Sequence, residues 1–402
     1  MKRLILTLLV LGWAATAAAQ PKRMSLEEQP DAPEPPTVYL YSFGIGEVVF
    51  EKFGHSALCL DYGTQFRRPF NVCFNYGVTN FHDPPGLVWG FVRSKAKFWV
   101  EPVPEPEIMR FYSEYEDRSV WRQKLPLTAA EARKVEHHLW NDLKPENRYY
   151  FYDHFYDNCT TRLRDIIDEA TDGRLRGDTD KQHHPLSFRE FGARGLAEFT
   201  PLIMVSDFIT GRSLDVHPTM WQAMFHPDEL RLAVEKAFDA PAEQIYERQG
   251  PPFPDRPDWH RGWMILFGLL LSVPFALVRW TGRRERLAMT LAVLPLIVFG
   301  IVVWAIFAII TIYWIRWNEA MLIFVPFDLA LPFLAAGVRR RYAQARVGMV
   351  VLATLLRAVG IFRQPLWVPA LVAFVPLALI AFDLPPRRKR AAEPVSSSSR
   401  AA

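Results

Sequence analysis

The last third of the chain alternates long apolar runs with short basic stretches, and this pattern constrains the fold more than any other feature. A helix needs about 20 predominantly apolar residues to cross a bilayer. The pattern therefore predicts a bundle of about five membrane helices. The predicted spans cover residues 262–278, 287–315, 320–338, 347–362 and 364–382. The middle of the chain is far less apolar, which predicts a separate domain before the bundle.

Three arginine clusters orient this bundle: 279–286, 339–346 and 387–390. With five spans, all three lie on one side of the membrane, and the basic side is cytoplasmic. The domain before the bundle is then outside the cytoplasm. Asp328 and Arg357 fall inside predicted spans, where charges usually pair, so we expect an Asp328–Arg357 pair. No basic face with interleaved aromatics precedes the spans, which argues against nucleic-acid binding.

The N-terminus has the form of an export signal. A charged start, an apolar centre and small residues at positions 17–19 predict a cleaved signal peptide over residues 1–19. The remaining boundaries follow from composition. We expect a disordered lead-in at 20–36, a periplasmic catalytic domain at 37–238, a Pro-rich linker at 239–258, the transmembrane bundle at 259–384 and a cytoplasmic basic tail at 385–402.

The middle domain shows both strand and helix signals, so we expect an α+β fold. Alternating segments predict a strand at 38–43 and a hairpin formed by 55–61 and 69–76. Thr128 and Glu131 form a capping box, which predicts a helix starting there. A second helix is expected over 159–170, with Asp157 or Asn158 as its N-cap.

Cys159 opens this second helix and is the best candidate for chemistry. The positive end of a helix and its free backbone N–H groups lower the pKa of a thiol and can hold a developing oxyanion. Arg162 and Arg164 add positive charge nearby. The alternative is a small buried residue that only packs at the start of the helix.

A nucleophilic cysteine needs a base, and His55 is the best candidate. Gly54 before it allows a tight turn or a close backbone approach. If Cys59 faces Cys73 in the hairpin, then Asn75 shares a face with His55 and could orient its imidazole. The same register allows Cys59 and Cys73 to form a disulfide or to remain buried thiols. The other histidines considered, ranked below His55, are His82, His137, His138, His154, His183 and His184.

Sequence motifs for cofactors are missing. The chain has no Cys-x-x-Cys, no His-Glu-x-x-His, no Gly-rich phosphate loop and no serine nucleophile elbow. We therefore expect neither a metal nor an organic cofactor. His217 and His226 receive no role at this stage.

Three motifs resemble one known family: Phe53–Ser56, Asn75–Gly77 and Tyr156–Arg162. They are similar to the periplasmic domain of the Lnb-type lipoprotein N-acyltransferases, and weaker similarity continues through 211–230 and 317–326. The order of histidine before cysteine also resembles permuted papain-like (NlpC/LRAT-like) folds, in which the cysteine opens a helix packed on a small antiparallel sheet.

The resemblance implies a mechanism and a location. Cys159 would form an acyl thioester with His55 as base and Asn75 as its orienting residue. Asn158, Thr160 and Arg162 would support the oxyanion. The acyl donor would be a membrane phospholipid, and the acceptor the N-terminal amine of a diacylglyceryl-cysteine lipoprotein. The protein would be a multi-pass protein of the bacterial inner membrane.

Two other readings stay open. A papain-like cell-wall peptidase or amidase also uses Cys and His, but it needs no five-span bundle and commonly places Cys before His. The second is a non-catalytic membrane sensor or assembly protein that keeps the same fold.

Overall fold

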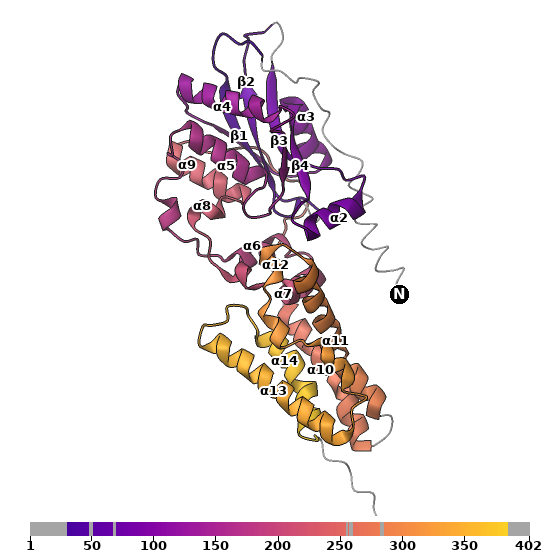
Figure 1. Ribbon diagram of the computed structural model, residues 1–402. Helices are drawn as coiled ribbons and strands as arrows, with labels where there is room; N and C mark the ends of the chain where they lie inside the picture. The colour runs from indigo at the N-terminus through magenta and orange to yellow at the C-terminus, as the bar shows by residue number, and fades with distance from the viewer. Residues whose placement is uncertain are drawn as a thin grey trace, which may run out of the picture. The chain divides into compact units, whose positions relative to one another are not determined.

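The structure is a computed structural model that describes residues 30–47, 51–66, 70–254, 256, 260–281 and 285–384. The chain forms two compact units (Figure 1). We call the first the sheet unit (1–203, 213–258 and 309–313) and the second the helical unit (204–212, 259–308 and 314–402). The predicted signal peptide, the first ten residues of the lead-in and the basic tail lie outside the described residues.

The sheet unit is built on one seven-stranded antiparallel sheet with the strand order β6-β4-β3-β2-β1-β5-β7. The strands are β1 (Thr37–Phe43), β2 (His55–Asp61), β3 (Asn71–Val78), β4 (Lys97–Pro104), β5 (Val120–Lys124), β6 (Tyr149–Phe151) and β7 (Glu243–Tyr246). β2 and β3 are central, which explains why their sequences are buried almost throughout.

Helices cover both faces of the sheet (Figure 1). One face packs against α4 (Ala129–Asp142), α5 (Cys159–Ala170) and α9 (Pro227–Phe238), and a large apolar core lies between these layers. The other face packs against α3 (Glu105–Arg110) and the π-helical turn Phe111–Tyr115, around a smaller core. The remaining elements of this unit are α2 (Pro84–Val92), η4 (Thr179–Lys181), α6 (Phe188–Gly195), the start of α7 (Thr200–Ile209), η5 (Arg212–Asp215) and α8 (Met220–Ala223).

The local predictions for this unit are confirmed. β2 and β3 form the predicted hairpin, and Cys59 faces Cys73 in it. Thr128 caps α4 through the predicted capping box with Glu131. Of the two candidate caps for α5, Asn158 is the N-cap. These features depend on hydrogen bonds between residues close in sequence, which is why the residue pattern alone could predict them.

The segments flanking this domain are more structured than predicted. Ala32, in the predicted lead-in, is buried, and its carbonyl accepts a hydrogen bond from Arg133 at 2.6 Å. The predicted linker contains β7, which adds a strand to the sheet edge beside β5. Proline-rich composition indicated a linker here, but an unpaired sheet edge can recruit even a short segment that lies next to it.

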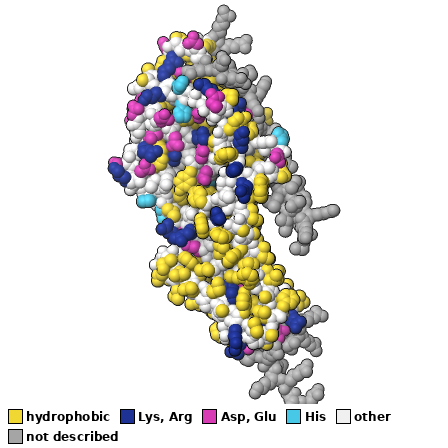
Figure 2. Space-filling view, in the orientation of Figure 1, with side chains coloured by type: hydrophobic (Ala, Val, Ile, Leu, Met, Phe, Trp, Pro, Cys, Tyr) yellow, Lys and Arg dark blue, Asp and Glu magenta, His cyan; other side chains and the backbone are white. Residues whose placement is uncertain are grey.

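In its described residues, the helical unit contains four long helices and several short helical segments. They are α10 (His260–Thr281), α11 (Glu285–Ile309), α12 (Tyr313–Arg316), η6 (Glu319–Leu322), η7 (Pro326–Ala330), α13 (Ala336–Ala358) and α14 (Trp367–Ala381). Among the described residues, α11 is long and apolar enough to cross a membrane, and α14 is a shorter apolar helix. Hydrophobic side chains dominate the visible face of this unit, whereas charges of both signs are mixed over the sheet unit (Figure 2).

The third predicted span is wrong as a helix. Residues 320–335 form two short 3-10 turns and irregular backbone instead. Glu319 at the start of this segment accepts the backbone N–H groups of Arg363 and Gln364 between α13 and α14. At the opposite end of the same helix pair, Arg340 lies 3.8 Å from Asp383. The segment therefore runs from one end of the α13–α14 pair to the other without being a helix.

Side chains satisfy the backbone of this irregular segment. Trp304 donates from its indole to the carbonyls of Met321 and Phe324, at 3.3 and 3.1 Å. Arg346 donates to the carbonyls of Leu322 and Ile323. Hydropathy shows only that the segment is apolar. Because these side chains bind its backbone carbonyls, the segment need not be helical.

The predicted Asp328–Arg357 pair is also wrong. Asp328 is fully buried and forms two hydrogen bonds with Arg346, at 2.8 and 3.0 Å, and a third with Tyr342. Arg357 is exposed. The irregular segment packs against the first half of α13, which contains Arg346, and this packing selects the partner.

Candidate functional site

Cys159 is the first residue of α5, and its position is set by the cap before it. The Asn158 side chain accepts the backbone N–H of Thr161 at 2.8 Å, and the Thr161 hydroxyl accepts the N–H of Asn158. The Asn158 amide also donates to the carbonyls of His154 and Phe225. These bonds fix the start of the helix to two neighbouring loops, so the sulfur is held at the positive end of the helix.

His55 is the first residue of β2 and is held by Asn75, as the hairpin register predicted. Its Nε2 atom lies 2.6 Å from Asn75 Oδ1. An amide oxygen can only accept, so Nε2 carries a hydrogen and Nδ1 is left for the sulfur. The ring also stacks on Tyr112, with 5.7 Å between centroids.

Gly77 allows the histidine and the cysteine to meet. Cys159 packs against the core on one face of the sheet. His55 alternates in step with the strand residues whose side chains belong to the core on the opposite face. At the β-bulge beside Gly77, a Cβ would lie 3.8 Å both from the Cys159 Cβ and from His55 Cε1. The positive φ of +96° suits glycine, so this residue leaves an opening at the strand end. Gly54 has a similar role, since a Cβ there would lie 2.8 Å from the Phe43 carbonyl.

The surroundings of the sulfur favour a thiolate. Burial raises the pKa of Cys159 and is the largest single influence on it, whereas the charge of His55 and its hydrogen bond lower it. The Thr160 hydroxyl and the backbone N–H of Ser56 lower it further, and the resulting pKa falls from 9.0 to about 7. Thr160 lies 3.6 Å from the sulfur. The pair can therefore exist as thiolate and imidazolium near neutral pH.

These residues line a cavity of about 200 Å³. Its walls are rich in aromatic rings, which come from strands, loops, α2 and the turn after α3. The aromatic lining residues are Phe53, Tyr76, Phe81, Phe91, Phe98, Phe111, Tyr112, Tyr152 and Phe225. A cavity of this kind suits the apolar part of a substrate, and the few polar groups in its wall can fix the orientation of that substrate.

Several lining residues escaped the sequence analysis. Tyr112 lies in the π-helical turn and Arg118 in the loop that follows it, where no motif marks them, and Phe91 and Phe98 received no role from the sequence. His154 lines the cavity too, and burial lowers its pKa to about 4, so it is neutral at pH 7. These residues belong to the cavity because of their neighbours in space, and no spacing along the sequence identifies them.

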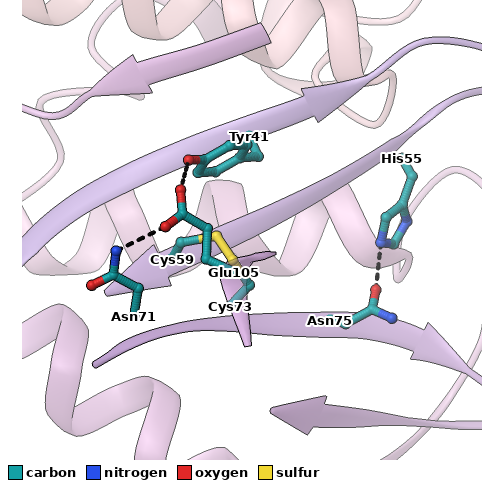
Figure 3. Close-up of a disulfide and its surroundings, with 7 residues drawn as sticks. All are labelled: Tyr41, His55, Cys59, Asn71, Cys73, Asn75 and Glu105. Atoms are coloured by element: carbon teal, nitrogen blue, oxygen red, sulfur yellow. Dashed lines mark hydrogen bonds between the residues drawn. A yellow bond between two sulfur atoms is a disulfide. The ribbon is translucent and has the colours of Figure 1, made fainter. Parts of the chain in front are cut away.

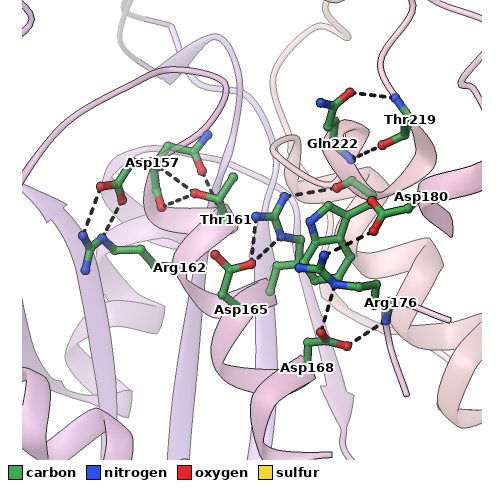
Figure 4. A network of polar contacts seen from close by, with 12 residues as sticks. Asp157, Thr161, Arg162, Asp165, Asp168, Arg176, Asp180, Thr219 and Gln222 are labelled. Carbon is green, nitrogen blue, oxygen red and sulfur yellow. Dashed lines mark hydrogen bonds and ion pairs between the residues drawn. The ribbon is translucent and has the colours of Figure 1, made fainter. Parts of the chain in front are cut away.

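Arg162 has a different place from the one expected of an oxyanion group. It binds Asp157 through two hydrogen bonds of 2.7 and 3.1 Å (Figure 4). Its guanidinium also lies over the Tyr150 ring. Arg164 binds Asp165 and the Trp221 carbonyl instead. The positive charge near the start of α5 therefore stabilises the turn before Cys159 and contributes no direct contact to the sulfur.

Cys59 and Cys73 form a disulfide across the hairpin (Figure 3). It lies between the Tyr41–Glu105–Asn71 contacts and the His55–Asn75 pair. The sequence had left a disulfide and two free thiols open. The bond ties together the two strands that carry the histidine and its amide partner.

The two histidines without an assigned role are structural. His226 is the N-cap of α9, where its Nδ1 accepts the backbone N–H of Asp228 at 3.3 Å. His217 lies 3.2 Å from the His184 carbonyl, and His183 contacts the His217 carbonyl. No group of three or more side chains suited to a metal occurs within the described ranges.

The comparisons agree with this geometry. Residues 28–192, which contain His55, Asn75 and Cys159, match the family model described as the Lnb N-terminal periplasmic domain. This part of the chain is similar to the periplasmic domain of the Lnb family. No curated protein matches the chain significantly, and no solved structure does so. The matched part of the chain combines a mixed α/β fold with a cysteine that is in contact with a histidine.

Proposed function

We propose that this protein is a cysteine-dependent lipoprotein N-acyltransferase of the inner membrane. The main supporting observation is the Cys159–His55 contact within an aromatic cavity of an Lnb periplasmic domain. The arrangement of a helix-opening cysteine beside an antiparallel sheet also supports the permuted papain-like relation. The apolar helical unit, with α11 as a candidate span, supports a place in the membrane.

The first half-reaction is acyl transfer from a phospholipid to the enzyme. The Cys159 thiolate attacks the ester carbonyl, and the new S–C bond forms as the carbonyl oxygen becomes an oxyanion. The first turn of a helix leaves N–H groups without internal partners, and Asn158 caps that of Thr161. The N–H groups of Cys159 and Thr160 are then suited to hold the oxyanion. On collapse, the C–O bond breaks, and the His55 imidazolium protonates the departing lysophospholipid.

The second half-reaction returns the enzyme to its starting state. The N-terminal amine of a diacylglyceryl-cysteine lipoprotein attacks the thioester, and neutral His55 takes the proton from its nitrogen. The S–C bond breaks, an amide remains on the lipoprotein, and Cys159 leaves as a thiolate beside the imidazolium. Asn75 keeps the His55 ring oriented through both steps.

Mass spectrometry of lipoprotein N-termini tests the proposal. Wild type and Cys159→Ala are expressed in a strain that lacks its lipoprotein N-acyltransferase, and membrane insertion is checked for both. The expected result is one added acyl amide per lipoprotein with wild type and none with Cys159→Ala. Cleaved peptidoglycan stems would point to the peptidase, and no change in either would point to a non-catalytic role.

The same spectra test the acyl donor. Transfer from a phospholipid increases the mass of the lipoprotein by one acyl group. If an N-acyl group appears with no increase in total mass, the chain came from the lipoprotein's own glyceryl ester. That result would contradict the phospholipid donor and leave the Cys159 chemistry intact.

A further inference from the structure

Arg118 is a buried cation with an unused hydrogen-bond donor at the wall of the cavity. Its side chain is only 2% exposed, and its Nη2 atom is buried without a hydrogen-bond partner among the described residues. Its Nε donates to the Gly44 carbonyl at 2.7 Å, which fixes the guanidinium in place. Leaving a buried charged donor unpaired is costly, so such a group indicates a missing partner.

The neighbouring carboxylates do not supply that partner. Asp117 accepts hydrogen bonds from Tyr246 and from the backbone of Gln249 and Gly250, in the segment at and after β7. Glu101, on the cavity wall, accepts from Trp99 and lies 3.5 Å from Arg148. Glu51 also lines the cavity but does not accept from the free Nη2 of Arg118. The neighbouring carboxylates therefore leave the Nη2 donor of Arg118 unpaired.

A single aromatic ring connects Arg118 to the reacting residues. The guanidinium lies over the Tyr112 ring, 4.7 Å from its centroid, and the same ring stacks with His55. Arg118, Tyr112, His55 and Cys159 all line the one cavity. An anionic group bound by Arg118 would thus lie in the same space as the sulfur.

We propose that Arg118 binds the phosphodiester oxygen of the phospholipid that donates the acyl chain. This inference rests on the proposed function. Of the two proposed substrates, the phospholipid carries a phosphate close to its acyl esters, whereas the diacylglyceryl-cysteine end of the acceptor carries a cationic amine. A fixed guanidinium recognises phosphate oxygens through charge-assisted hydrogen bonds. Arg118 therefore selects the donor and places its ester carbonyl toward Cys159.

Donor selectivity of the full-length protein tests this role. Purified wild type and Arg118→Gln are each mixed with phosphatidylglycerol or with a diacylglycerol of the same chains, which lacks the phosphate. Formation of the Cys159 thioester is followed by intact mass spectrometry in single-turnover conditions. Losing one charge-assisted bond should slow Arg118→Gln about 10- to 100-fold with phosphatidylglycerol. The rate with diacylglycerol should stay within about two-fold of wild type, because that bond is never made.

Two further variants separate binding from folding. Arg118→Lys keeps the charge and should recover part of the rate with phosphatidylglycerol. Arg122→Gln is the matched control, since Arg122 also lies over a tyrosine ring, that of Tyr39, but outside the cavity. Alkylation of Cys159 at the wild-type rate reports an intact site in each variant.

The outcomes are distinguishable. Equal losses with both lipids, or no loss with phosphatidylglycerol, would overturn the role of Arg118 while the thioester chemistry stands. If wild type forms no thioester from either lipid or from a neutral activated acyl ester, the proposed function fails and the role of Arg118 fails with it.

Discussion

Replacing His55 by glutamine should change how the reactivity of Cys159 depends on pH. His55 is the largest of the contributions that lower the pKa of this thiol to about 7. Glutamine cannot carry the charge, so the pKa should return to 9.0 or above, because burial then acts with little opposition. At pH 7 the thiolate fraction should fall from about one half to about 1%.

The two effects on rate oppose each other. A thiolate of higher pKa is intrinsically more nucleophilic, and with a Brønsted coefficient of about 0.45 a rise of two pKa units increases its reactivity about eight-fold. At pH 7 the variant should therefore react about six-fold more slowly than wild type. Above about pH 9 nearly all of the wild-type sulfur and much of the variant sulfur is thiolate, so the variant should react faster. The two curves should cross between about pH 8 and 9.

Alkylation by iodoacetamide between pH 5 and 10 measures these curves, with Cys159 as the free thiol. His154→Gln is the matched control, because His154 lines the same cavity but is neutral at pH 7 and cannot stabilise a thiolate by charge. Its inflection should stay near pH 7. A wild-type inflection near 9, or curves for wild type and His55→Gln that never cross, would refute the electrostatic coupling of the two residues.

Three other predictions concern the residues around the site and the helical unit. Replacing Cys59 and Cys73 together by alanine should lower the free energy of unfolding by about 3 kcal/mol, because the disulfide closes a short loop; unchanged thermal unfolding of the variant would contradict this. Asn75→Ala should reduce thioester formation about 10-fold or more by releasing the imidazole, while a full rate at every pH would remove its orienting role. Asp328→Leu should destabilise the protein by about 3–5 kcal/mol because it leaves Arg346 buried without its counterion. The double variant Asp328→Leu/Arg346→Met should recover much of that loss, as measured by thermal unfolding in detergent, and no recovery would argue against the pair.

The family resemblance and the residues able to do chemistry could be predicted from the sequence. A cysteine that opens a helix, a capping asparagine before it and a histidine at a strand start are all local patterns, and the structure confirms these positions. The assumed pairing of Cys59 with Cys73, combined with the alternation of side chains, placed Asn75 near His55, and the structure has both the pairing and the contact. Such features depend on hydrogen bonds and periodicity over a few residues.

The helical unit shows where such reasoning fails. Hydropathy identified apolar segments correctly but could not decide which of them is helical. The segment between Glu319 and α13 is irregular because Trp304 and Arg346, distant in sequence, satisfy its carbonyls. Asp328 pairs with Arg346 because this segment packs against the first half of α13, although Arg357 was the charge expected from the predicted spans.

The sequence by itself determined the local elements of this protein: its strands, its caps, its apolar runs and the residues able to do chemistry. The tertiary structure decided which of them meet. Gly77 opens the strand end where Cys159 and His55 come together, and Tyr112 and Arg118 complete the cavity from a turn without any motif. Periodicity and capping act between near neighbours, whereas the site depends on packing between segments far apart along the chain, which no local pattern encodes.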